Sequence, residues 1–311
     1  MDFHYRNHNN LRLIKMKKIK LYWWKDAPNF GDAASPYIIQ KLFGLNIVYC
    51  NPSLCIHKEI YRLIRNMCTG KQYVFPSSKG YVYPWEKGLY AIGSILDGST
   101  YKTLVWGSGF REFNSKYKGG KIYAVRGKLT QNLLPDRIKN KVLAIGDPAL
   151  LLPLVYTPDR NVSHNIGIVP HFMDYDYFSS TYGQKYFIID VRTSDVEKVI
   201  QQICSCKLIL STSLHGLIIS HAYGIPALWI RKGWINSSEF KFYDYFSSVN
   251  IPKYDGFFNL DEILLDNGSI ENLFIHNKEL SLIHSNLQTI QEKLIKAFPF
   301  SEDTKANTFH V

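Results

Sequence analysis

The chain has 311 residues, of which 46% are hydrophobic and 14% aromatic, and its formal net charge is +11. This length exceeds that of most single domains, so we expect two domains. The sequence lacks the roughly 18 or more uncharged apolar residues that a membrane span requires, and it has no long basic run or finger motif, which argues against a transmembrane or a nucleic-acid-binding protein. The excess of Lys and Arg favours anionic partners, such as phosphates or an acidic membrane surface, although solubility alone would account for much of it.

The N-terminal segment carries charge but has neither the apolar core nor the small-residue cleavage site of a secretory signal. Met16 opens MKKIKLYWW, a natural first strand, so residues 1–15 are expected to lie outside the fold, either as a disordered leader or because the start of the chain is misassigned. The five cysteines, with Cys204 and Cys206 as the closest pair, match neither a disulfide framework nor a zinc site. We therefore expect a cytoplasmic protein with reduced thiols.

Short apolar runs that end in Gly or Asp alternate with helical patterns along the chain, which is typical of a parallel sheet wound by helices. The strands predicted in the first half are IKLYWW, LYAI, TLVW, KIYAV and KVLAI, and those in the second half are NIGIV, YFIID, KLILS and PALWI. A segment with two prolines, near residues 152–164, reads as a linker between the halves. The predicted fold class is therefore α/β, with two doubly wound Rossmann-like domains that face a cleft.

The domain boundaries follow from this pattern. The N-terminal Rossmann-like domain is expected over residues 16–155 and the C-terminal one over residues 163–274. Apolar residues then recur at helical spacing, at Leu280, Ile283, Leu287, Ile290 and Leu294. This spacing predicts one amphipathic helix within residues 275–300 that packs back on the body of the protein.

Sheets of this kind bind ligands beyond the carboxyl ends of their strands, so the segments that follow the strands are candidate ligand loops. Most of them contain Gly, which lets the backbone approach a ligand closely, but ordinary turns also use Gly. None completes the GxGxxG or GxxxxGK[ST] pattern, which argues against a nicotinamide or ATP enzyme. The candidate loop residues in the first half are Asn29, Gly31, Gly93, Gly107, Ser108 and Gly109.

Two polar residues stand at predicted helix starts beside these loops. Asp32, in NFGD, follows the first strand, where a carboxylate complements the positive end of the helix dipole. His215, in STSLHG, follows a buried strand at the start of an apolar helix. The free N–H groups, hydroxyls and dipole there suit an anion, and a histidine beside them can exchange a proton near neutral pH. Simple capping by Asp32 and simple packing of His215 are the alternatives.

Eight sequence blocks occur in order over about residues 20–250. They are NFGDAASPYI, AIGSIL, VWGSGF, VRGKLTQNLL, GDPALLLP, GIVPHF, STSLHGLIISHAYGIPALW and KFYDYFSS. Together they resemble the polysaccharide pyruvyl transferase family. The resemblance implies a fold like that of the type B glycosyltransferases, with the acceptor on the N-terminal domain and the donor on the C-terminal domain.

The resemblance also implies a reaction. Pyruvate passes from phosphoenolpyruvate to two hydroxyls of a sugar in a cell-surface or exopolysaccharide precursor, which gives a cyclic ketal and free phosphate. Phosphoenolpyruvate is a co-substrate, and no cofactor, metal or nucleotide is implied. The expected partners are this donor and a sugar or lipid-linked oligosaccharide acceptor, with peripheral attachment to the cytoplasmic face of the inner membrane.

Site roles follow residue by residue from the resemblance. The family histidine falls on His215, the expected acid. The position of Asp32 at the ligand end of the first strand, rather than the resemblance, suggests that it accepts a proton from the acceptor or holds its hydroxyls. Arg126, in the VRG block, would anchor the donor, with a structural salt bridge, for example to Asp147, as the alternative. The other expected donor contacts are Ser213, Leu214, Gly216 and His171.

One departure from the family concerns the phosphate. Some members carry Arg where this chain has Ser213, so another cation must hold the phosphate here. The candidates are Arg111, Arg192, Arg231 and Lys232.

The main alternative function is that of a nucleotide-sugar-dependent glycosyltransferase of the same fold class, because AYGIP resembles the Gly-x-Pro turn of those enzymes. Retaining members place two Glu around this turn, where this chain has Ser211 and Ile219. A catalytically inactive sugar-binding or scaffold protein is a third reading, against which the intact His215, Asp32 and Arg126 argue.

Overall fold

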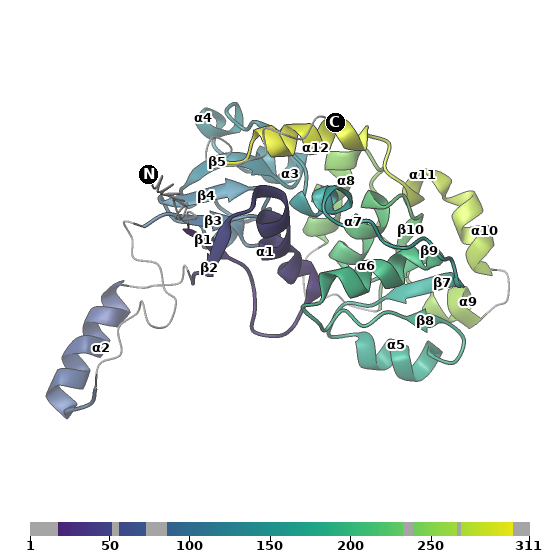
Figure 1. The fold of residues 1–311 in the computed structure, drawn as a ribbon, viewed down its shortest axis with the longest axis horizontal. Helices are drawn as coiled ribbons and strands as arrows, with labels where there is room; N and C mark the ends of the chain where they lie inside the picture. Colours follow the sequence, from purple (N-terminus) through teal and green to yellow (C-terminus); the bar gives the residue numbers. More distant parts are fainter. Residues whose placement is uncertain (1–17, 52–55, 73–85, 233–238, 266–268, 301–311) are drawn as a thin grey trace, which may run out of the picture.

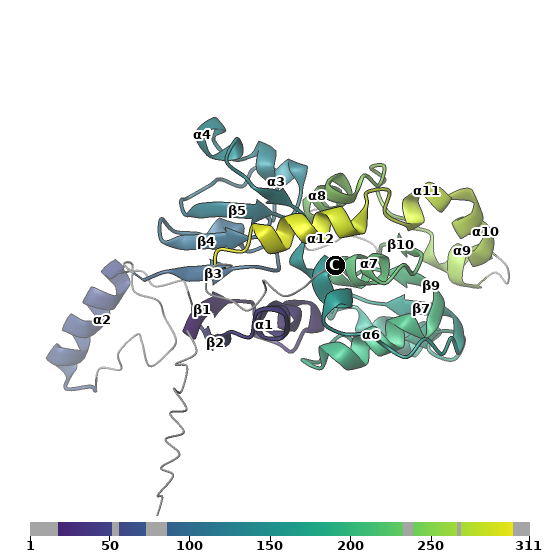
Figure 2. The ribbon, with the colours of Figure 1, turned by 45° about the horizontal axis from the view of Figure 1, so that its top comes forward.

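Two parallel sheets organise the chain (Figures 1 and 2). The structure is a computed structural model that describes residues 18–51, 56–72, 86–232, 239–265 and 269–300, so the leader expected over residues 1–15 lies outside the described residues. The first sheet has the order β2-β1-β3-β4-β5-β6 and the second the order β10-β9-β7-β8.

The strands of the first sheet are β1 (Lys18–Tyr22), β2 (Asn46–Tyr49), β3 (Gly88–Tyr90), β4 (Thr103–Trp106), β5 (Lys121–Val125) and β6 (Ala144–Ile145). Those of the second are β7 (His164–Val169), β8 (Phe187–Ile188), β9 (Cys206–Ser211) and β10 (Ala227–Trp229). All neighbouring strands pair in parallel. The predicted α/β class with two parallel sheets is therefore confirmed.

Helices other than α2 surround both sheets, whereas α2 stands apart from them (Figures 1 and 2). They are α1 (Phe30–Phe43), α2 (Ile56–Thr69), α3 (Lys128–Asn132), α4 (Asp136–Lys139), α5 (Tyr175–Tyr182), α6 (Val196–Cys204), α7 (Leu214–Ala222), α8 (Phe240–Val249), α9 (Leu260–Leu265), α10 (Ser269–His276), α11 (Lys278–Ser281) and α12 (Leu287–Lys296), with the 3₁₀ helices η2 (Leu96–Gly98) and η3 (Pro148–Leu154). No helix in the described ranges is both long and apolar enough to cross a bilayer.

The helices α1 and α7 begin close to the carboxyl ends of β1 and β9. Asn29 caps α1 by accepting a hydrogen bond from the N–H of Gly31 at 3.1 Å, and Gly44 ends the helix in the left-handed conformation, at φ 63°. Ser213 caps α7 in the same way through the N–H of Gly216 at 3.4 Å. The sequence of α7 is apolar on nearly all sides, and the helix is therefore almost wholly buried. Both helix starts are thereby fixed in place.

The two sheets share one core. A single cluster of buried apolar side chains runs from Ile19 in β1 to Ile209 in β9. Its centre includes η3, which packs against α1, α7 and α12 and whose residues Leu150, Leu151 and Leu152 are fully buried. The leucine run of GDPALLLP therefore joins the two halves.

The C-terminal segment returns to the first sheet. The indole of Trp106 donates to the carbonyl of Leu294 in α12 at 2.8 Å, and the ring of Phe298 stacks on that of Phe43 with centroids 3.7 Å apart. The sequence predicts one helix within residues 275–300, but the structure has two shorter ones, α11 and α12. The chain breaks between them because the N–H groups of His284 and Ser285 donate to a carbonyl of α8 rather than continuing α11.

Candidate active site

A cleft of about 480 Å³ lies between the two sheets, within the size range of small-molecule sites. Segments that follow strands of both sheets line it, as expected for parallel sheets. The lining residues that the sequence also predicts are Asn29, Asp32, Gly93, Arg111, His171, Ser213, Leu214, His215, Arg231 and Lys232. The structure therefore brings the predicted acid, the predicted base and three of the four candidate cations together in one cleft.

His215 is the second residue of α7 and faces α1 of the other half of the molecule. A Cβ at Gly31 would overlap with Nδ1 of the imidazole, so only glycine at that position leaves room for the ring. Its Nε2 atom is buried and has no hydrogen-bond partner in the described part of the chain. An unpaired buried polar atom typically costs about 1–3 kcal/mol, so such an atom in a cleft points to a bound ligand.

The charge state of His215 is set by its surroundings. Burial lowers its pKa to about 3, and the neighbouring charges of Arg126, Lys241 and His171 act in the same direction. Burial likewise lowers the pKa of His171 to about 4. Both imidazoles are therefore neutral at physiological pH in the unliganded protein, and an anionic ligand would raise their pKa values.

Asp32 lies in the first turn of α1 and is half-buried in the cleft wall. Its pKa is raised to about 7, mainly by burial and also by the charge of Asp147, and these effects outweigh the opposing effect of Lys241. A carboxyl group with this pKa changes its protonation state near neutral pH, as a general acid or base must. Asp32 thus stands at a helix start, as predicted, and the buried surroundings of its carboxyl group disfavour the ionised form.

Replacing Asp32 by Asn should stabilise the protein near pH 8. The pKa of the carboxyl is about 7 in the folded chain, against 3.8 as its ordinary value, so its ionisation disfavours the folded state increasingly from pH 3.8 up to about pH 7. An amide does not ionise, so the gain should be largest above pH 7 and should shrink as the pH falls. At about 1.4 kcal/mol for each pKa unit, we expect a gain on the order of 2–4 kcal/mol near pH 8. Urea unfolding near pH 5 and pH 8 measures it.

A matched control for this experiment is Asp176→Asn, which alters a carboxylate whose side chain is 85% exposed and paired with Arg192. It should give no gain at high pH. Equal stabilities of Asp32→Asn and the wild type at both pH values would show that the cleft does not destabilise the ionised carboxylate.

Lys241 also lines the cleft, and sequence reasoning missed it. It lies in the first turn of α8, where burial, together with the charges of Arg126 and Arg111, lowers its pKa to about 8. The sequence could have pointed to Lys241, because this lysine is the first residue of the KFYDYFSS block that resembles the family. Four cations, Arg111, Arg231, Lys232 and Lys241, thus face two carboxylates, Asp32 and Asp174, which leaves the cleft with a positive balance when all are ionised.

Two more residues of the lining have unpaired polar atoms. Nε1 of Trp229 and Nε of Arg231 are buried donors without a partner in the described ranges. The remaining nitrogens of Arg231 are occupied, since Nη1 donates to the carbonyl of Asp255 at 3.0 Å and Nη2 to Glu239 at 2.7 Å. Donors without acceptors next to lysines are what an anionic ligand would satisfy.

Arg126 does not line the cleft. Its fully buried guanidinium donates from Nε to Asp244 at 2.9 Å, from Nη1 to Ser94 at 2.5 Å and from Nη2 to the carbonyl of Phe110 at 2.8 Å. Asp244 also accepts from the N–H and the hydroxyl of Thr130, both at 2.7 Å. This network supports the structural alternative for Arg126, with Asp244 rather than Asp147 as its partner.

Several other predicted site residues shape the cleft from outside it. A Cβ at Gly109 would lie 2.5 Å from Cζ of Arg126, and one at Gly107, at φ 94°, would overlap with Pro148. A Cβ at Gly216 would overlap with the hydroxyl of Ser211. The buried hydroxyl of Ser108 donates to the carbonyl of Gly93 at 2.8 Å.

Arg192, the fourth candidate cation, does not line the cleft. It pairs with Asp190 and Asp176, at 3.0 and 2.9 Å.

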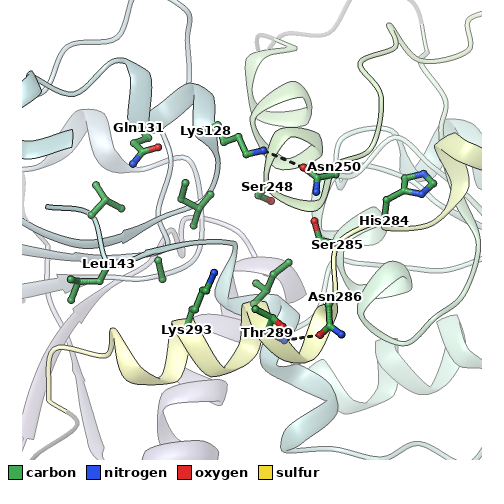
Figure 3. A pocket seen from close by; sticks show the side chains of 14 residues that line it. Lys128, Gln131, Leu143, Ser248, Asn250, His284, Ser285, Asn286, Thr289 and Lys293 are labelled. Atoms are coloured by element: carbon green, nitrogen blue, oxygen red, sulfur yellow. Dashed lines mark hydrogen bonds between the residues drawn. The ribbon is translucent and has the colours of Figure 1, made fainter. Parts of the chain in front are cut away.

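A second cavity, of about 570 Å³, lies between α3, β6, the end of α8 and the start of α12 (Figure 3). Lys128 and Lys293 line it, but Nζ of Lys128 already donates to Asn250 at 3.1 Å. Its described lining has no carboxylate and no buried polar atom without a partner. The one histidine of this lining, His284, has its Nε2 2.7 Å from the carbonyl of Glu279, so the cleft, where an imidazole and carboxyl groups occur together, is the better candidate active site. Among the described residues there is also no group of three or more His, Cys, Asp or Glu that would hold a metal.

Comparisons with known proteins agree with the sequence blocks. The model of the family described as polysaccharide pyruvyl transferase matches residues 29–231, more than half of the chain. The uncharacterized protein L143 of Acanthamoeba polyphaga mimivirus is 30% identical over 247 residues, which are 76% of each chain. Among solved structures, the glycosyltransferase SnogD from Streptomyces nogalater aligns with 91% of this chain and 99% of its own, at 10% identity and a TM-score of 0.34. On the family match and the relative, the chain belongs to the polysaccharide pyruvyl transferase family.

Proposed function

We propose that this protein transfers pyruvate from phosphoenolpyruvate to two hydroxyls of a sugar, forms a cyclic ketal and releases phosphate. Membership of the family supports pyruvyl transfer in polysaccharide biosynthesis. The observation that carries the proposal is the composition of the cleft, where cations and unpaired donors surround an imidazole and a carboxyl group.

The donor is a small molecule with a carboxylate and a phosphate, and it therefore needs a compact, positively charged site. Lys241, Arg231 and Lys232 supply charge, and α7 adds the N–H groups and dipole of its first turn. In this proposal Lys241 and Arg231 replace the arginine that some members carry at the position of Ser213. Lys232 is partly engaged, because its Nζ lies 3.9 Å from Asp174.

The proposed reaction divides between His215 and Asp32. Binding of the anionic donor raises the pKa of His215, which takes up a proton and delivers it to the methylene carbon of phosphoenolpyruvate. The first sugar hydroxyl attacks the neighbouring carbon, and Asp32 accepts its proton. The bond from that carbon to the phosphate oxygen then breaks, the second hydroxyl attacks the same carbon to close the ketal ring, and its proton passes to the departing phosphate. Two hydroxyls and the donor thus yield the ketal and inorganic phosphate.

A retaining nucleotide-sugar enzyme finds no support at the two positions where such enzymes hold Glu, whereas inverting enzymes can lack this pair. Ser211 stands where retaining glycosyltransferases hold one of their two Glu, and its hydroxyl is occupied by the carbonyls of Val169 and Ser213 at 2.8 and 2.9 Å. Ile219, at the other position, is fully buried in α7. Neither residue offers a carboxylate for a ribose.

Phosphoenolpyruvate should raise the melting temperature of the protein without added metal, while uridine diphosphate sugars should not. A ligand at 100 times its dissociation constant stabilises by about 2.7 kcal/mol. We expect Lys241→Ala to lose most of this stabilisation, because it removes a buried cation from the donor side of the cleft. Thermal melts with each ligand, together with phosphate release that requires both donor and acceptor, measure these effects.

The matched control is Lys293→Ala, which removes a lysine of the second cavity (Figure 3) and should leave the donor effect unchanged. Stabilisation by a nucleotide sugar alone, or stabilisation that appears only with a divalent metal, would favour the glycosyltransferase instead.

A further inference from the structure

Two aromatic side chains from opposite halves of the molecule meet at the cleft. Trp24 belongs to the segment between β1 and α1, and Phe172 follows β7 of the second sheet. Their ring centroids lie 5.3 Å apart, and the ring planes are inclined by 40°. Both side chains are half-buried and line the cleft that also holds Asp32 and His215. Neither ring takes part in the proton transfers of the proposed reaction.

The neighbouring tryptophan shows that the sequence separates two uses of an indole. Trp23 packs against the shared core and sets its ring nearly at right angles to that of Tyr49, with centroids 4.9 Å apart. Trp24 turns instead to Phe172 and the cleft. Packing on the core therefore explains the indole of Trp23, whereas that of Trp24 is left to the cleft.

The strand order gives the cleft two chemically different sides. In the second sheet β9 lies between β10 and β7. Arg231 follows β10, His215 follows β9 and Phe172 follows β7, so the imidazole stands between a cationic side and an aromatic side. The first sheet repeats this order, because Trp24 follows β1 and Arg111 comes after β4, with β3 between the two strands. The anionic donor suits the cationic side, which leaves the aromatic side for the acceptor.

We propose that Trp24 and Phe172 form a stacking surface for the pyranose ring of the acceptor sugar. The face of an aromatic ring is negatively polarised, whereas the C–H groups on one face of a pyranose are weakly positive and gain from leaving water. Asp174, two residues after Phe172, lines the same side with a side chain that is 27% exposed, so it can accept a hydrogen bond from a sugar hydroxyl. The proposal rests on the proposed function, which requires a sugar beside phosphoenolpyruvate, and it assigns residues that hold the ring rather than move protons.

Saturation-transfer NMR with simple sugars tests this surface directly. The full chain is mixed with the methyl pyranosides of glucose, galactose and mannose, and with the open-chain polyol sorbitol. At least one pyranoside should receive saturation on the C–H groups of one ring face, and sorbitol should not. Trp24→Leu should weaken binding of that pyranoside about tenfold, because leucine keeps apolar volume but removes the aromatic face, and Phe172→Leu should weaken it as well. Trp24→Phe, which keeps an aromatic face, should retain most of the binding.

The matched control is Trp23→Leu, the same substitution one residue earlier in a ring that faces Tyr49, and it should bind the pyranosides like the wild type. Trp24→Leu should melt near the wild-type temperature and keep the wild-type response to phosphoenolpyruvate, because the cationic side is intact. Pyranoside signals that are absent from the wild type or unchanged in Trp24→Leu would overturn the proposal, as would loss in this variant of a response to phosphoenolpyruvate that the wild type shows. Signals of uridine that depend on Trp24, while the pyranosides give none, would assign the rings to a nucleobase instead. The measurement involves no turnover, so its failure is distinct from a failure of pyruvyl transfer in the phosphate-release assay.

Discussion

His215→Ala should slow pyruvyl transfer by about 10²- to 10⁴-fold, the usual effect of losing a positioned proton donor or acceptor. The imidazole faces the cleft at the start of α7, and its Nε2 has no partner in the described part of the chain. Because no protein hydrogen bond to Nε2 is lost, we expect little change in the melting temperature and retained binding of phosphoenolpyruvate. Phosphate release with both substrates measures the rate, and thermal melts measure the donor effect.

His221 is a matched control in the same helix. It is buried like a core residue, with Nδ1 3.0 Å from the hydroxyl of Tyr245 and Nε2 3.2 Å from the carbonyl of Ala227. His221→Ala should therefore reduce stability while the folded fraction keeps its activity. If His215→Ala unfolds the chain, His215 is a packing residue; if it folds and transfers pyruvate at nearly the wild-type rate, the proton comes from elsewhere and His171 is the next candidate.

The strands of the fold are largely readable in the sequence. Each of the nine predicted apolar runs forms a strand, because strands buried on both faces are nearly continuous apolar segments. One strand of the structure, β2, was not predicted. Its four residues alternate between exposed and half-buried positions at the edge of the first sheet, so it lacks a continuous apolar run. The division of the last helix into α11 and α12 was equally hidden, because it depends on hydrogen bonds to the end of α8, far away in the sequence.

The site was predictable where a residue follows its own strand, as Asp32 and His215 do. Sequence reasoning missed Lys241 and gave Arg126 a donor role that the geometry does not support, for one physical reason. The helix α8 follows the second sheet in sequence but packs against α3 of the first half, which sets Asp244 against Arg126 although 118 residues separate them. A lysine or arginine in isolation does not reveal whether such a partner exists.

Arg126→Ala should therefore reduce the free energy of unfolding by about 3–5 kcal/mol, the typical loss when one partner of a buried ion pair is removed. Asp244 would keep its buried charge but lose the guanidinium at 2.9 Å, and the contacts of Arg126 with Ser94 and Phe110 would also vanish. We expect Asp244→Ala to be comparably destabilising, because it leaves the arginine unpaired. Urea unfolding of both single variants measures these losses.

The control is Arg192→Ala. The side chain of Arg192 is 36% exposed and has two carboxylate partners. Exposed ion pairs contribute only about 0–1 kcal/mol, so this variant should unfold much like the wild type. The comparison isolates burial, because both arginines pair with carboxylates and only Arg126 is shielded from water. The opposite result would support a donor-binding role for Arg126. In that case Arg126→Ala would keep its stability but show a raised KM for phosphoenolpyruvate, because the guanidinium would contact the substrate. The pair with Asp244 would then contribute little to folding.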